Sequence, residues 1–194
     1  MRLFEYPGKP GPLHRSVVET LLRGGFVSFG QVEYDFLSEH RRWYEDFFHV
    51  SFGIDLLCEG EVFYCVNTSS SSRIAERLLT MVAVLLYEIG KDGRDPVAVL
   101  KNEIFTVDKI NRIMDGSVQF PEYAKSHGMS NAFLGKLESL GIVRRAGSEE
   151  NEFLFAPAID VFLNKYKQIN DEFSLEGHEE ENQKPNGRAD AAKG

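Results

Sequence analysis

The sequence has little cysteine: two of its 194 residues are of this type. Cys58 and Cys65 stand on either side of EGEVFY, a pattern that predicts a β-hairpin with a tight turn. Such a turn does not place the two cysteines directly opposite each other, so we expect free thiols rather than a disulfide. No second pair of cysteine or histidine residues has metal-ligand spacing, which argues against a zinc site and predicts no bound metal.

Long hydrophobic runs are absent as well. No stretch approaches the ~20 uninterrupted apolar residues that a membrane-spanning helix needs. The first residues, MRLFEYPGKPGPLHRS, lack the apolar centre of a signal peptide. We therefore expect a cytoplasmic protein that has no membrane partner.

The sequence also lacks the short motifs of common enzymes. The segment GKDGRDP does not have the glycine, lysine and hydroxyl spacing of a phosphate-binding loop. The five histidines are scattered without a His-Glu-x-x-His pair, and no Gly-x-Ser-x-Gly nucleophile elbow occurs. These absences predict a protein that is not an enzyme, with no catalytic residue and no cofactor.

Basic charge is scarce, and the formal net charge is -8. Residues 171–194 hold seven acids and three bases, so this short tail carries half of the excess. The preceding 170 residues hold 23 acids and 19 bases. No strong basic field covers the body of the protein, so any contact with nucleic acid has to come from a local patch.

The apolar residues that are present recur in an order that occurs twice along the chain. In residues 13–67 the pattern predicts a helix, a short strand, two aromatic-rich helices and a hairpin, which is the order of a winged-helix domain. In residues 73–170 a similar order returns around a long apolar helix and ends in an amphipathic helix. We therefore predict a mainly helical α+β fold made of tandem winged-helix domains. The predicted divisions are an irregular N-terminal arm (1–12), an N-terminal winged-helix domain (13–67), a linker (68–72), a C-terminal winged-helix domain with its closing helix (73–170) and a disordered acidic tail (171–194).

The segment KLESLGIVRRAGSEENEFLFAP, residues 136–157, predicts the last helix and the wing of the second domain. In a winged-helix protein this helix enters a groove of DNA and the base of the wing contacts phosphates. Lys136, Arg144 and Arg145 are therefore candidate DNA-binding residues. The alternative, which we favour slightly, is that both arginines form ion pairs across the hairpin with glutamates of the wing. These glutamates are Glu149, Glu150 and Glu152.

Several segments share their order and spacing with one known family. They are LLRGGFVSFGQVEYDFLSEHRRWYEDFFHVSFGIDLLCEGEVFYCV, then, after a polar link and a long apolar helix, EIFTVDKINRIM, and finally FLGKLESLGIVRR followed by NEFLFAPAIDVF. In this arrangement residues 13–167 resemble the MukE and MksE family, the small tandem winged-helix ("kite") subunits of bacterial condensins. Those condensins contain an SMC-like ATPase and a kleisin.

This resemblance implies a homodimer that binds the linker of a kleisin of the MukF or MksF type. Through the kleisin it would join an SMC-like ATPase of the MukB or MksB type and act on the nucleoid in chromosome organisation and segregation, or in plasmid defence. The subunit itself would hydrolyse nothing. Family members also present basic residues to DNA, and Lys136, Arg144 and Arg145 match those positions. The acidic wing tip SEENE departs from a purely basic DNA-binding wing, and the whole chain is acidic, so we expect DNA binding that is weak or confined to the complex.

The segment HRRWYEDFF, residues 40–48, supplies candidates for contact with the partner. Apolar grooves between winged-helix units suit capture of an extended or helical kleisin segment, because buried anchors give affinity and a charged rim sets the register. We expect the exposed members of this segment to make such contacts. The candidates are Arg41, Arg42, Trp43, Tyr44 and Phe47.

The alternative function is that of a dimeric winged-helix transcription regulator. A regulator that binds DNA on its own needs a basic face for sequence-independent attraction to phosphates. The negative charge of the body argues against this alternative.

Overall fold

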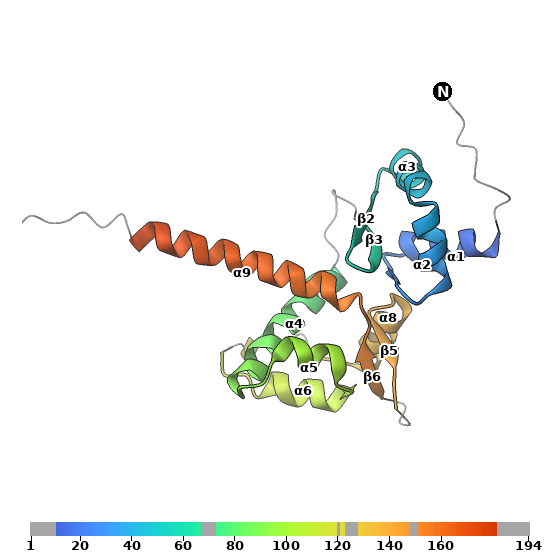
Figure 1. The fold of residues 1–194 in the computed structure, drawn as a ribbon. Coiled ribbons are helices and arrows are strands. Elements are labelled where there is room, and N and C mark those ends of the chain that lie inside the picture. Colours follow the sequence, from blue (N-terminus) through green and yellow to red (C-terminus); the bar gives the residue numbers. More distant parts are fainter. Residues whose placement is uncertain (1–10, 67–72, 120, 123–127, 148–150, 182–194) are drawn as a thin grey trace, which may run out of the picture.

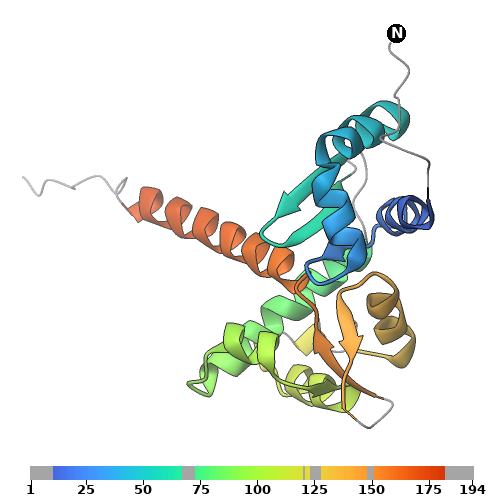
Figure 2. The ribbon, with the colours of Figure 1, turned by 45° about the vertical axis from the view of Figure 1, so that its right-hand side comes forward.

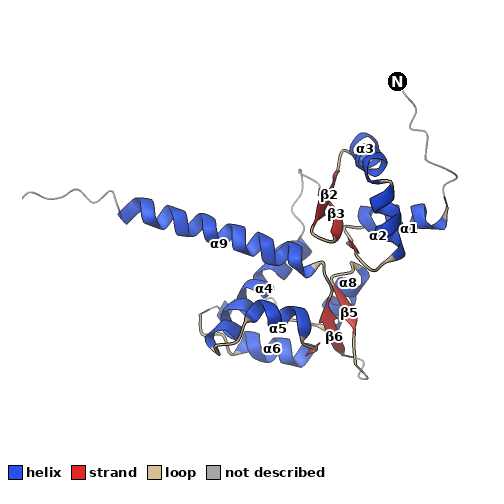
Figure 3. Ribbon diagram, viewed as in Figure 1, coloured by secondary structure: helices blue, strands red, loops and turns tan. Residues whose placement is uncertain are grey.

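The computed structural model describes the chain in five stretches, 11–66, 73–119, 121–122, 128–147 and 151–181. Helices predominate in them, and the strands form two small antiparallel sheets (Figure 3). The predicted mainly helical α+β fold is therefore confirmed. The predicted linker and most of the predicted arm and tail lie outside these stretches. Within them, no helix is both long and apolar enough to cross a membrane.

The N-terminal unit has the element order of a winged-helix domain (Figure 1). Pro12 opens its first helix, at a position where the missing N–H of proline costs no hydrogen bond, so the helix begins within the predicted arm. Gly53 ends the third helix with φ +65°, a conformation that glycine adopts without a clash of Cβ. The elements are α1 (Pro12–Leu22), β1 (Val27–Ser28), α2 (Val32–Glu39), α3 (Arg41–Phe52), β2 (Asp55–Glu59) and β3 (Val62–Val66).

The C-terminal unit repeats this order after a long helix. Asp95 and Thr106 cap two of its helices, because their side chains accept hydrogen bonds from backbone N–H groups of the first turn. Ser130 caps the helix before the second wing in the same way. The elements are α4 (Arg73–Lys91), α5 (Pro96–Asn102), β4 (Phe105–Thr106), α6 (Val107–Asp115), α8 (Asn131–Ser139), β5 (Val143–Arg145), β6 (Glu152–Phe155) and α9 (Ile159–Glu181).

Each unit contains a three-stranded antiparallel sheet with its last strand in the middle, in the orders β1-β3-β2 and β4-β6-β5. In the first sheet Cys58 lies opposite Phe63, and Cys65 lies opposite Leu56. The predicted hairpin, in which the two cysteines are not directly opposite, is therefore confirmed. Both cysteines are free thiols and half-buried.

The two units are joined through one hydrophobic core. Phe26 and Val62 of the N-terminal unit are buried in the core cluster of the C-terminal unit. The backbone N–H of Phe26 donates to the carbonyl of Leu140 over 2.9 Å, and the Phe26 ring centroid lies 5.8 Å from that of Phe162. A main-chain hydrogen bond and a buried ring therefore fix the units against each other.

Helix α9 packs against the body with its first half and projects from it with its second half (Figures 1 and 2). Ile159, Phe162 and Leu163 are buried, whereas Asn170 is exposed. The helix continues to Glu181, although the sequence predicts a disordered tail from residue 171. Loss of apolar periodicity shows only that a helix is no longer docked, and a helix that leaves the body keeps its own backbone hydrogen bonds. The predicted boundary at residue 170 is corrected accordingly.

Candidate functional site

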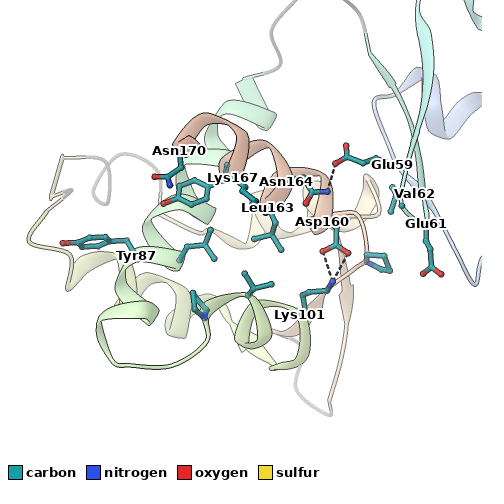
Figure 4. A pocket seen from close by; sticks show the side chains of 16 residues that line it. Glu59, Glu61, Val62, Tyr87, Lys101, Asp160, Leu163, Asn164, Lys167 and Asn170 are labelled. Carbon is teal, nitrogen blue, oxygen red and sulfur yellow. Dashed lines mark hydrogen bonds and ion pairs between the residues drawn. The ribbon is translucent and has the colours of Figure 1, made fainter. Parts of the chain in front are cut away.

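A groove of about 810 Å³ runs between the first hairpin and the helices of the C-terminal unit (Figure 4). The β2–β3 turn forms one wall, and α4, α5 and α9 form the others, so both units contribute to it. Its apolar side chains come from three helices, one strand and the segment between β6 and α9. They are Val62, Leu86, Tyr87, Pro96, Val97, Pro157, Leu163 and Tyr166.

Two polar contacts hold the walls of this groove together (Figure 4). The Nδ2 of Asn164 in α9 donates to Oε1 of Glu59 in β2 over 2.6 Å. The Nζ of Lys101 in α5 lies 2.9 Å from Oδ1 and 3.0 Å from Oδ2 of Asp160 in α9. Helix α9 is thus tied to the first wing on one side and to α5 on the other.

Glu59 has a second partner within the first hairpin. The hydroxyl of Tyr64 donates to its Oε2 over 3.0 Å. Burial, and next the bond to the Glu59 carboxylate, raise the pKa of Tyr64 to about 12. The phenol therefore stays protonated at neutral pH and keeps Glu59 oriented toward α9.

The groove offers apolar contact area and polar groups of both signs. Val97 and Tyr87 are 43% and 39% exposed, which is high for side chains of their size. Glu61 and Lys167 add opposite charges to the lining. Among the residues that the structure describes, no three histidine, cysteine or acidic side chains could together hold a metal ion. This mixture suits a bound polypeptide segment, for which apolar anchors supply affinity and the charges set direction.

The three candidate DNA-binding residues lie together on α8 and β5. Lys136 and Arg144 are exposed. Arg145 donates from Nε to Oε2 of Glu138 over 3.0 Å, so a base at the foot of the wing is neutralised by an acid of the helix beside it. The hairpin register places Arg144 opposite Leu154 and Arg145 opposite Phe153. Among the described residues Arg145 thus pairs with Glu138, and its predicted pairing with the wing glutamates stays a prediction, since Glu149 and Glu150 lie outside the described residues.

A set of contacts orients α8. The side chain of Asn111 in α6 bonds both backbone groups of Met129: its Oδ1 accepts from the N–H over 2.7 Å, and its Nδ2 donates to the carbonyl over 2.9 Å. The guanidinium of Arg77 in α4 donates to the carbonyl of Gly128 and lies 4.0 Å from the centroid of the Phe133 ring. These contacts fix the start of α8. They also engage the guanidinium of Arg77 in contacts inside the protein.

The candidate partner-binding residues on α3 divide into three environments. Arg41 and Arg42 are exposed, and Arg41 donates to Glu45 one turn further on, over 2.7 Å. Trp43 and Phe47 are half-buried with their rings stacked, 4.9 Å apart at 13°. Four of the five candidates therefore reach the surface of the N-terminal unit.

Tyr44, the fifth candidate, is wrong as a surface contact. It is fully buried, and its hydroxyl lies 2.9 Å from Nδ1 of His14 in α1. Burial lowers the pKa of His14 from its ordinary value. Tyr44 and Phe48 occupy positions one turn apart on the core face of α3. In an aromatic-rich helix, the sequence did not show which rings form that face.

The groove of Figure 4 was not found from the sequence. Its lining comes from four segments between residues 59 and 170, and no local motif links them. Tyr87 and Val97 are large apolar side chains on exposed helix positions, and this was the only sign of the groove in the sequence. The sign could not be used, because only the fold shows that these two positions line the same groove.

A protein-family model described as condensin complex protein MksE matches residues 12–167. No curated protein matches the chain.

Proposed function

We propose that this chain, which belongs to the MksE family of condensin complex proteins, is the non-catalytic subunit that binds the kleisin of its complex. The complex would contain a kleisin of the MukF or MksF type and, held through it, an SMC-like ATPase of the MukB or MksB type. A homodimer of this chain would act in the cytoplasm on the nucleoid. Its process is chromosome organisation and segregation, or plasmid defence.

The observation that carries this proposal is the groove between the two units. A kleisin linker is a polypeptide segment, and the groove presents exposed Val97 and Tyr87 beside polar groups of both signs. Apolar side chains of the linker would cover Val97 and Tyr87, while Glu61 and Lys167 would fix its direction. The exposed arginines of α3 are a second contact area in this proposal.

DNA would be contacted by Lys136 and Arg144 when the complex holds the duplex against α8. Two exposed bases give only a small electrostatic contribution, because affinity for DNA grows with the number of phosphates neutralised. We therefore expect weak, salt-sensitive binding by the isolated protein.

A single substitution tests the groove. Val97→Asp places a carboxylate among the apolar contacts, and an acid in the first turn of α5 is compatible with the helix dipole, so folding is retained. We expect the affinity for a kleisin of the MksF type from the same organism to fall about tenfold or more, because the carboxylate has to be desolvated. Titration calorimetry with the purified kleisin measures it.

The matched control is Val118→Asp, which adds the same charge at a side chain that is 86% exposed and outside the groove. This control should bind the kleisin as tightly as the unmodified protein. Equal affinities of Val97→Asp and the unmodified protein would place the kleisin elsewhere.

A further inference from the structure

A stripe of aromatic side chains crosses α3 beside the first turns of α1. It consists of His14, Trp43, Phe47 and Phe52, which we call the aromatic stripe. The His14 ring centroid lies 5.8 Å from those of Trp43 and Phe47, and the Phe47 centroid lies 5.6 Å from that of Phe52. The four rings thus form one continuous surface that joins two helices.

This surface is apolar and reaches solvent at one end. Phe52 is 47% exposed, and Val50, two residues earlier on the same helix, is 62% exposed. Trp43 and Phe47 are half-buried. A contiguous group of large apolar side chains at a surface marks a docking site for another segment.

The chain itself supplies a segment of fitting chemistry next to the stripe. Residues 1–10, MRLFEYPGKP, precede Gly11, which lies one helical turn from His14. They contain Leu3, Phe4 and Tyr6, followed by two prolines that favour an extended backbone. A hollow of about 780 Å³ lies along the first two turns of α1, between Gly11 and Glu19.

The segment is long enough to cover the stripe. An extended chain advances about 3.3 Å per residue, so the stretch from Gly11 back to Leu3 spans roughly 25 Å. Helix α3 has 12 residues and, at about 1.5 Å per residue, is roughly 18 Å long. The apolar residues at positions 3, 4 and 6 can therefore reach the rings of α3 from their point of attachment.

We propose that residues 2–7 of this chain dock on the aromatic stripe of the same chain, with Leu3 and Phe4 covering Trp43, Phe47 and Phe52. Attachment at Gly11 keeps the segment at a high local concentration, so a few apolar contacts suffice to hold it. Arg2 adds a charge that matches the exposed Asp46 on α3. The proposal rests on the fold alone and does not depend on the proposed function.

Docking of this segment changes the role of two candidate partner contacts. Trp43 and Phe47 would be covered by the chain's own N-terminus, whereas Arg42 would stay exposed. A partner that binds α3 would then meet a surface made jointly by α3 and residues 2–7.

Trp43 is the sole tryptophan of the chain and reports directly on the stripe. In the full-length protein, the double substitution Leu3→Ser and Phe4→Ser should shift its fluorescence emission to the red and increase its quenching by acrylamide. Val118→Ser, a control at an exposed side chain in the other unit, should change neither. Unchanged emission and quenching in the double variant would overturn the proposal. The substitutions lie outside the described helices, and the melting temperature checks that the body stays folded.

A second measurement separates the chain's own segment from a second copy. A nitroxide attached through Glu5→Cys, in a Cys58→Ser and Cys65→Val background that keeps Leu3 and Phe4, should quench Trp43 to the same degree at every protein concentration. The same label attached through Val118→Cys, an exposed position in the other unit, should quench Trp43 less. Quenching by the label at position 5 that disappears on dilution would show that a neighbouring copy supplies the segment, and would refute docking within one chain.

Discussion

Asn164 of α9 and Glu59 of the first wing are 105 residues apart in the sequence and 2.6 Å apart in the structure. The bond joins the projecting helix to the N-terminal unit at the edge of the groove. Glu59 is held from its other side by the hydroxyl of Tyr64. A carboxylate with two neutral donors thus sets the distance between the walls of the groove.

Replacement of this amide by a second carboxylate should open the contact. Asn164→Asp removes the donor and sets two negative charges against each other, so we expect the free energy of unfolding to fall by roughly 1 kcal/mol. Chemical denaturation measures this change. Gln168→Glu adds a negative charge to an exposed position one turn further along α9 and is the matched control. Equal losses in the two variants would show that the hydrogen bond contributes nothing.

Removal of the acid beside the second wing should strengthen DNA binding. Glu138→Gln removes the 3.0 Å ion pair with the Nε of Arg145 and takes one negative charge away from α8 and β5, the elements that carry the three candidate bases. The affinity of the isolated protein for a duplex should rise, and the slope of log K against log salt should steepen by up to about 0.9. Fluorescence anisotropy at several salt concentrations measures both quantities.

The two arginines of the wing should differ in this assay. Arg144→Gln removes a base that forms no ion pair with the described residues, whereas Arg145→Gln removes one that Glu138 already balances. We expect the larger loss of affinity from Arg144→Gln. The reverse order would contradict the placement of DNA at this wing.

Replacement of glycine by alanine should change stability in opposite directions at two positions, one within α8 and one directly after it. Gly141 follows α8 with φ +75°, and a Cβ there would lie 3.0 Å from the carbonyl oxygen of Phe26. Gly141→Ala should therefore cost about 1–2 kcal/mol of stability. Gly135 lies within α8 with no atom in the way, so Gly135→Ala should add roughly 0.5–1 kcal/mol. Thermal unfolding of the two variants provides the comparison.

The thiol of Cys65 should make the protein less stable at alkaline pH. Burial, and next the charge of Asp55, raise the pKa of this thiol from 9.0 to about 12. Between these values the unfolded chain loses the proton while the folded chain keeps it, so the free energy of unfolding falls as the pH rises. Tyr64, with its pKa raised from 10.0 to about 12, acts in the same direction.

Cys65→Val should weaken this pH dependence, because the variant has no thiol to titrate. Denaturation at a series of alkaline pH values gives the slope. Alkylation offers an independent check: in the native protein at neutral pH, a thiol with this pKa should resist modification. Rapid modification of Cys65 under those conditions, located by peptide mass mapping, would contradict the raised pKa.

Local patterns predicted most of the elements of this fold. Gly24 and Gly25 mark the end of α1, and the Glu-Gly-Glu turn places the first hairpin. Ser130 and Gly141 bound the helix before the second wing. Each of these signals acts through the backbone within a few residues, so each can be seen without knowledge of the rest of the chain.

Predictions about individual side chains depended on longer-range packing and were less successful. Tyr44 is a core residue, although its aromatic neighbours Trp43 and Phe47 reach the surface. Arg145 has a partner on α8, Glu138, which the hairpin pattern alone did not indicate. The groove needs α4, α5, α9 and the first hairpin in place before it exists.

The bond between the N–H of Phe26 and the carbonyl of Leu140 is made by main-chain atoms alone. Exchange of either side chain leaves its donor and acceptor in position, and among the standard residues only proline at position 26 would remove the donor. This hydrogen bond therefore needs no particular side chain at position 26 or 140. Exposed surfaces on both sides of it can change one residue at a time for a different partner while this bond and the shared core keep the two units in their relative placement.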